Sequence, residues 1–99
     1  MKTAREEILS KLVERRAPIR RFGVRRLGLF GSRARGRAGR SSDIDFVVEF
    51  ERKSFDSYMG LKAYLERLFR REIDLVLADA IKPRLRPAIL REAVYVPGF

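Results

Sequence analysis

The sequence predicts an α+β fold in which a small mixed β-sheet carries helices packed on one face. Strands are predicted over 24–30, 43–50 and 72–78, and apolar and polar residues alternate along the last two. Apolar residues recur at helical spacing over 4–16, 55–70 and 81–93. This order along the chain favours helices that cover the apolar side of one sheet, with the acidic residues on its other side.

The first predicted helix, 4–16, opens with a capping-box pattern formed by Thr3 and Glu6. Pro18 is expected to end this helix or to lie just beyond its end. One face of the helix carries Ile8, Leu9, Leu12 and Val13.

The strand 24–30 runs into Gly31-Ser32, where the chain must turn. The following strand, 43–50, alternates along most of its length. One side carries Ile44, Phe46, Val48 and Phe50, and the other carries Asp43, Asp45, Val47 and Glu49.

The second half predicts a helix over 55–70 that Ser54 could cap, then the strand 72–78. The third helix, 81–93, has Pro83 in its first turn, and Pro87 could move its true start to about that residue. A short last strand is expected at 94–96. The buried stripe of the second helix is predicted to be Phe55, Tyr58, Leu61, Leu65, Leu68 and Phe69.

The length of 99 residues favours one domain that spans 1–99. The chain has no cysteine and no histidine, which excludes disulfides, cysteine–zinc sites and histidine-based triads. No apolar run approaches the roughly 20 residues that a membrane span needs. We therefore expect a cytoplasmic protein whose chemistry depends on carboxylates, hydroxyls, basic groups and a hard metal ion.

The net charge of +10 comes mainly from 18 arginines. Arginine suits the recognition of phosphate and carboxylate, so the charge fits a nucleotide, a nucleic acid or an acidic protein. A compositional bias of the source organism would also explain it. The charge alone does not identify the partner.

Asp43 and Asp45 stand two residues apart on a predicted strand, so both carboxylates face the same side, about 7 Å apart along the backbone. Asp74 has the same polar phase on another strand. If the two strands pair side by side, the three carboxylates repel one another, and Mg²⁺ would relieve that repulsion. Two such ions could stabilise the attacking and leaving oxygens of a phosphoryl displacement. The alternative is a set of surface aspartates on a solvated sheet face.

The segment Gly31-Ser32-Arg33-Ala34-Arg35-Gly36 is a candidate phosphate-binding loop. Gly31 allows backbone amides to approach a ligand closely, and Ser32 can donate its hydroxyl to a phosphate oxygen. Arg33 and Arg35 add positive charge, although they could equally form a solvated basic turn. The spacing matches neither a Walker A motif nor a dinucleotide fingerprint.

Taken together, the stretch GSRARGRAGRSSDIDFVVEF with Asp74 further on resembles the minimal nucleotidyltransferases of the DNA polymerase β-like superfamily. Their pattern is close to Gly-Ser-x-Ala-Arg-Gly followed by Ser-Asp-x-Asp. The resemblance covers almost the whole chain and implies the polymerase β-like nucleotidyltransferase fold.

The resemblance implies that Asp43, Asp45 and Asp74 are catalytic and hold two magnesium ions, with ATP as the nucleotide. Gly31 and Ser32 would contact the triphosphate, with Arg33, Arg35 and Ser42 as further nucleotide-binding residues. It also implies an antitoxin of the HEPN/MNT toxin–antitoxin type. Such a protein would transfer AMP to a tyrosine hydroxyl of a HEPN-domain ribonuclease toxin, with which it forms a hetero-oligomer.

Three alternatives stay open. The chain could be a non-catalytic module that neutralises a HEPN partner by docking. It could transfer a nucleotide to a small molecule, although no acceptor domain is evident. It could also be a nucleic-acid-binding protein, in which case binding would depend steeply on salt concentration.

Overall fold

The computed structural model describes residues 4–31 and 44–99. Its elements run helix, helix, strand, strand, helix, strand, short 3-10 helix, helix and strand along the chain. They are α1 Ala4–Glu14, α2 Arg16–Arg20, β1 Val24–Phe30, β2 Ile44–Phe50, α3 Phe55–Phe69, β3 Ile73–Leu77, η1 Ala78–Ala80, α4 Arg86–Glu92 and β4 Val94–Tyr95. The predicted α+β class with a small mixed sheet is confirmed.

The four strands form one sheet in the order β3-β2-β1-β4. β2 pairs antiparallel with β1 and parallel with β3, while β4 pairs antiparallel with β1. The parallel pair is joined through α3, which is the crossover connection that parallel strands require.

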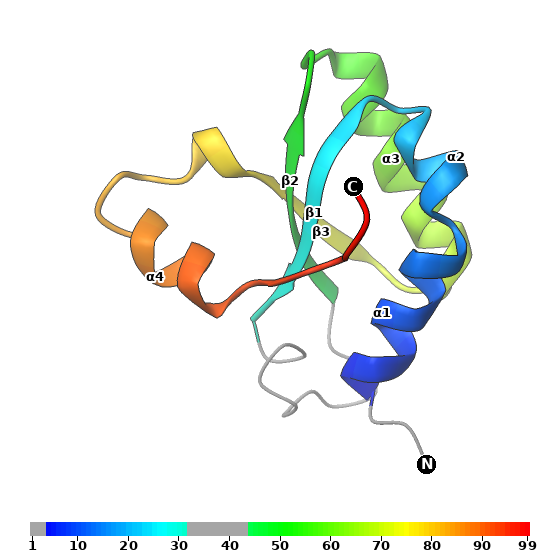
Figure 1. Cartoon of the computed structure of the whole chain (residues 1–99). Helices are drawn as coiled ribbons and strands as arrows, with labels where there is room; N and C mark the ends of the chain where they lie inside the picture. Colours follow the sequence, from blue (N-terminus) through cyan, green and yellow to red (C-terminus); the bar gives the residue numbers. More distant parts are fainter. Residues whose placement is uncertain (1–3, 32–43) are drawn as a thin grey trace.

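The main core lies between the sheet and a layer formed by α1, α2 and α3 (Figure 1). The alternation predicted for β2 is confirmed, because Ile44, Phe46, Val48 and Phe50 all belong to this core. Leu12 and Ile19 from the first two helices and Leu61 and Leu65 from α3 are fully buried against them.

α4 lies on the opposite side of the sheet, so the expectation that helices cover one face is wrong for this helix (Figure 1). Its Ile89 and Leu90 join a second apolar cluster with Val47 and Val76. The two valines interrupt the polar phase of their strands. They create an apolar strip on that face, and burying it stabilises the packed helix.

Three element boundaries differ from the predicted ones. The first helix stops at Glu14, and Pro18 lies in the first turn of the separate helix α2, where its missing N–H costs no helical hydrogen bond. The third helix starts at Arg86 with Pro87 in its first turn, as the alternative start anticipated. The last strand ends at Tyr95.

α3 matches its prediction at both ends within one residue. The Ser54 hydroxyl oxygen accepts a hydrogen bond from the Ser57 amide at 3.0 Å, which confirms the cap. Phe55, however, is 77% exposed and does not belong to the buried stripe. None of the helices within the described ranges is long and apolar enough to cross a bilayer.

Candidate active site

Two of the predicted metal ligands lie side by side at the beginning of β2 and β3. Asp45 and Asp74 are direct partners in the parallel register, with Ile44 opposite Ile73 and Phe46 opposite Leu75. Partners on neighbouring strands project to the same face, and such strands lie about 4.8 Å apart. Asp45 is half-buried and Asp74 is exposed, so the pair borders solvent.

Gly31 brings the end of β1 against this pair. Phe30 is the antiparallel partner of Asp45, and Gly31 follows it with φ +77°, a conformation that favours glycine. A Cβ at this residue would overlap the Asp45 carboxylate. Because Gly31 has no side chain, the backbone of the turn can lie directly against the Asp45 carboxylate.

The other predicted site residues lie outside the described ranges. They are Ser32, Arg33, Arg35, Ser42 and Asp43. Within residues 4–31 and 44–99, no three acidic side chains are grouped closely enough to hold a metal ion together. A three-carboxylate site on this face would therefore need Asp43, which precedes β2 directly.

The chemistry of the described pair fits a hard divalent cation. Carboxylate oxygens are the ligands that Mg²⁺ prefers, and Mg²⁺ usually takes one or two protein carboxylates and completes its shell with water and phosphate oxygens. Asp45 and Asp74 supply two carboxylates, and the missing side chain of Gly31 leaves the room that the Asp45 carboxylate occupies.

Next to the acidic pair, the same face of the sheet becomes apolar. Val47 and Val76 are register partners two residues further along their strands, and Val47 is buried. Ile89 and Leu90 of α4 pack on this row. The acidic pair thus lies at the end of a strip that α4 covers.

Glu49, also on this face, belongs to a separate ionic group. Its carboxylate lies 3.7 Å from Arg25 Nη2 and 3.3 Å from Arg26 Nη1, so Glu49 forms salt bridges with the neighbouring strand β1. The Arg26 guanidinium also lies 4.0 Å from the centre of the Tyr95 ring. Burial raises the pKa of Tyr95.

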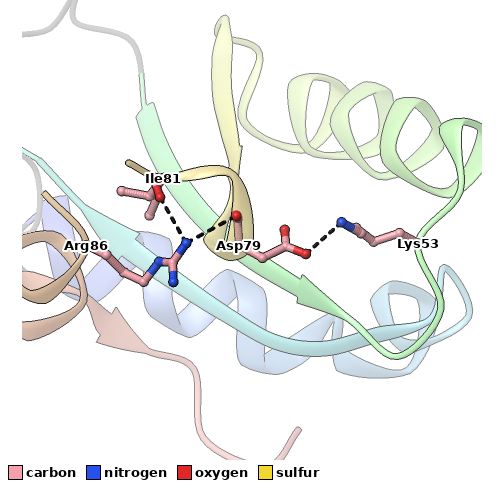
Figure 2. Close-up of polar contacts among 4 residues, drawn as sticks. All are labelled: Lys53, Asp79, Ile81 and Arg86. Carbon is pink, nitrogen blue, oxygen red and sulfur yellow. Dashed lines mark hydrogen bonds and ion pairs between the residues drawn. The ribbon is translucent and has the colours of Figure 1, made fainter. Parts of the chain in front are cut away.

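A hollow of about 540 Å³ lies at the other end of β2 from Asp45. Figure 2 shows the polar contacts along its wall. Lys53 Nζ donates to Asp79 Oδ2 at 2.6 Å, and Arg86 Nη2 donates to the carbonyl oxygens of Asp79 and Ile81 at 3.2 and 3.0 Å. The hydrogen bond from Lys53 lowers the pKa of Asp79.

These contacts tie the loop before α3 to η1 and to the start of α4. No sequence motif predicts them, because Lys53, Asp79 and Arg86 belong to three different segments. Asp79 lies two residues after the end of β3, and an acidic residue just past a strand is the one local signal that could have indicated it.

Comparison with known proteins adds to this geometry. The family model described as "Nucleotidyltransferase domain" matches residues 6–96. The protein adenylyltransferase MntA of Thermococcus cleftensis is 43% identical over 93 residues, which cover 92% of this chain and 94% of the relative.

Two solved structures share the fold. One is a chain provisionally named a minimal nucleotidyltransferase, with a TM-score of 0.73, 38% identity and coverage of 87% of this chain and 93% of its own. The other is a complex of a tri-AMPylated HEPN toxin from Shewanella oneidensis with an MNT antitoxin. Its matching chain has a TM-score of 0.64 and 17% identity, with 92% of this chain and 73% of its own covered, so this likeness shows the fold alone.

Proposed function

This chain belongs to the nucleotidyltransferase domain family and is a nucleotidyltransferase, and on that premise we propose that it transfers AMP from ATP to a tyrosine hydroxyl of a HEPN-type toxin. The observation that carries the proposal is the in-register pair Asp45 and Asp74 beside the turn at Gly31. The 43% identity to a protein adenylyltransferase supports AMP as the transferred group and a protein as the acceptor.

Asp45 and Asp74, together with Asp43, would hold two Mg²⁺ ions. When bound, these ions supply positive charge that stabilises the attacking oxygen and the leaving phosphate oxygen. Without bound metal ions, the carboxylates would repel the negatively charged triphosphate. The metal ions and the nucleotide are therefore expected to bind together.

The turn that starts at Gly31 would hold the triphosphate. Gly31 exposes backbone amides without a side chain in the way, and Ser32 would donate its hydroxyl to a phosphate oxygen. Arg33, Arg35 and Ser42 would add contacts to the same group. In this proposal these residues would orient the α-phosphate toward the carboxylates.

In the transfer step, the acceptor oxygen forms a bond to the α-phosphorus and the bond from that phosphorus to the β-phosphate bridging oxygen breaks. Pyrophosphate leaves with the electron pair of that bond. The hydroxyl proton passes to Asp74, which is exposed and therefore accessible from solvent, and then to water.

The proposed HEPN partner is supported by the fold likeness to a chain of the complex between an MNT antitoxin and an AMPylated HEPN toxin. We propose that this chain neutralises such a toxin by modifying it, and that the two proteins form a hetero-oligomer. In the alternative, the chain neutralises the same partner by docking alone, and the carboxylates are not needed.

The test replaces Asp45 and Asp74 by asparagine, singly and together. With α-labelled ATP, Mg²⁺ and a HEPN-type protein as the acceptor, each single variant should lose at least about a hundredfold in transfer rate, because Asn is neutral and binds the metal poorly. Glu49→Gln is the matched control, since it removes a carboxylate from the same face of β2 outside the pair.

Wild-type transfer rates in the double variant would refute the assignment. Loss of transfer with intact neutralisation of the toxin in co-expression would instead support docking as the biological role. Thermal unfolding of each variant shows whether the loss reflects chemistry or folding.

A further inference from the structure

A positively charged pocket lies on the helical side of the sheet, away from the face that carries Asp45 and Asp74. It is a hollow of about 470 Å³ between the carboxyl ends of α1 and α3, which both belong to the layer seen on one side of the sheet in Figure 1. Lys11, Arg15, Arg67 and Arg70 line it, with Glu14 as the one acidic residue.

The four cations outnumber the single carboxylate of the pocket, that of Glu14. None of them forms an ion pair within the described chain, whereas Arg26 pairs with Glu49 and Lys53 with Asp79. Lys11 instead lies 6.0 Å from the centre of the Phe69 ring. Four like charges around one hollow repel one another, and a bound anion would relieve that repulsion.

The backbone conformation of Arg70 is a second, independent indication that this pocket has a function. This residue ends α3 with φ 54° and ψ 42°, and it is the one non-glycine residue with positive φ in the described ranges. Glycine is the usual residue at this position of a helix end because its backbone is not strained there. A strained arginine whose side chain lines a cationic pocket points to a function for that side chain.

The composition of the pocket favours phosphate over a folded protein. Stable protein interfaces are built around buried apolar anchors. Leu68 and Phe69 also line this pocket, but both are only partly exposed and Phe69 packs on the main core. The large apolar residues that are exposed in the described ranges, Phe55, Met59 and Leu85, lie outside the pocket. Three of the four cations are arginines, whose planar guanidinium groups match phosphate oxygens.

We propose that this pocket binds the phosphodiester backbone of a nucleic acid. The site is separate from the catalytic face, so nucleic acid and nucleotide could bind at the same time. Neither the proposed transfer reaction nor the HEPN partner is needed for this inference.

The test measures binding of the full chain to a labelled RNA of about 12 nucleotides, a length typical of one single-strand binding site. Fluorescence anisotropy is recorded from about 50 to about 300 mM KCl. The variant Lys11→Gln/Arg15→Gln/Arg67→Gln should bind at least about tenfold more weakly at the lowest salt. Its slope of log affinity against log salt should fall by about two, because each lost phosphate contact removes about 0.7.

The control is Lys82→Gln/Arg84→Gln/Arg91→Gln, which removes the same charge from exposed residues in and before α4. It should keep most of the affinity. Equal losses in the two triple variants would overturn the proposal, because binding would then reflect net charge or another segment.

Arg70→Gly separates binding from stability. Glycine relieves the positive φ, so the midpoint of thermal unfolding should stay or rise while RNA affinity falls. Unchanged RNA affinity in this variant would contradict the role of Arg70. A DNA of the same sequence should bind through the same phosphates, whereas tighter binding of a glutamate-rich peptide than of either nucleic acid would show a protein ligand and refute the proposal.

Discussion

At the scale of single residues, the candidate site depends on one close approach. Gly31 adopts φ +77° at the end of β1, and its α-carbon faces the carboxylate of Asp45. Two separate demands, a left-handed backbone and the absence of a Cβ, therefore act on the same residue. Gly23 shares the first demand without the second, since it has φ +85° and no atom within 4 Å of a Cβ built there.

This pair of glycines gives a matched prediction. Gly31→Ala should destabilise the fold by about 1–3 kcal/mol and lower the rate of nucleotide transfer at least about tenfold, because the new methyl group displaces Asp45. Gly23→Ala should cost about 1 kcal/mol from backbone strain alone and leave transfer intact. Urea unfolding and the labelled-ATP assay measure both effects, and similar losses of transfer in the two variants would contradict the role of the contact.

At the scale of elements, α3 determines how the acidic pair forms. It connects β2 to β3 in parallel, and the register between these strands places Asp74 next to Asp45. Tyr58 of α3 donates its hydroxyl to the Leu75 carbonyl oxygen at 2.5 Å, which fixes the helix against β3. The positions at which α3 begins and ends therefore affect the register between β2 and β3.

The start of α3 can be tested through its cap. Ser54→Ala removes the acceptor for the Ser57 amide and should destabilise the chain by about 1 kcal/mol. Ser57→Ala keeps that amide and its acceptor, so it should change the free energy of unfolding by much less. A midpoint of chemical unfolding that is unchanged in Ser54→Ala would show that the cap contributes nothing.

The elements also show what local sequence can and cannot predict. The strands β1, β2 and β3, the alternation of β2 and β3 and the cap at Ser54 were predicted, because each depends on neighbours a few residues away. The exposure of Phe55 was not, since helical spacing alone does not show where the sheet ends beneath a helix. The position of α4 was missed because Val47 and Val76 look like isolated exceptions in a polar phase.

At the scale of the whole molecule, the same limit applies to the site. The sequence placed Asp45 and Asp74 in the same phase of two strands and put a glycine turn before the first of them. That these strands are neighbours in exact register depends on the packing of α3 and the core, which no local pattern contains. The hollow at Lys53, Asp79 and Arg86 and the cationic pocket both join distant segments and were not predicted for the same reason.

The segment after β4 contacts α2, which is far from it in the sequence, and this contact carries the last prediction. Arg16 and Arg20 of α2 donate to the carbonyl oxygens of Pro97 and Gly98 at 3.0 and 2.6 Å, and Phe99 packs on the main core. Phe99→Ala should therefore destabilise the fold by about 1–2 kcal/mol, less than a fully buried phenylalanine would. Phe55→Ala is the control, because that ring is 77% exposed and its loss should change stability by less than about 0.5 kcal/mol. Equal unfolding midpoints for the two variants would mean that the segment after β4 does not contribute to the stability of the core.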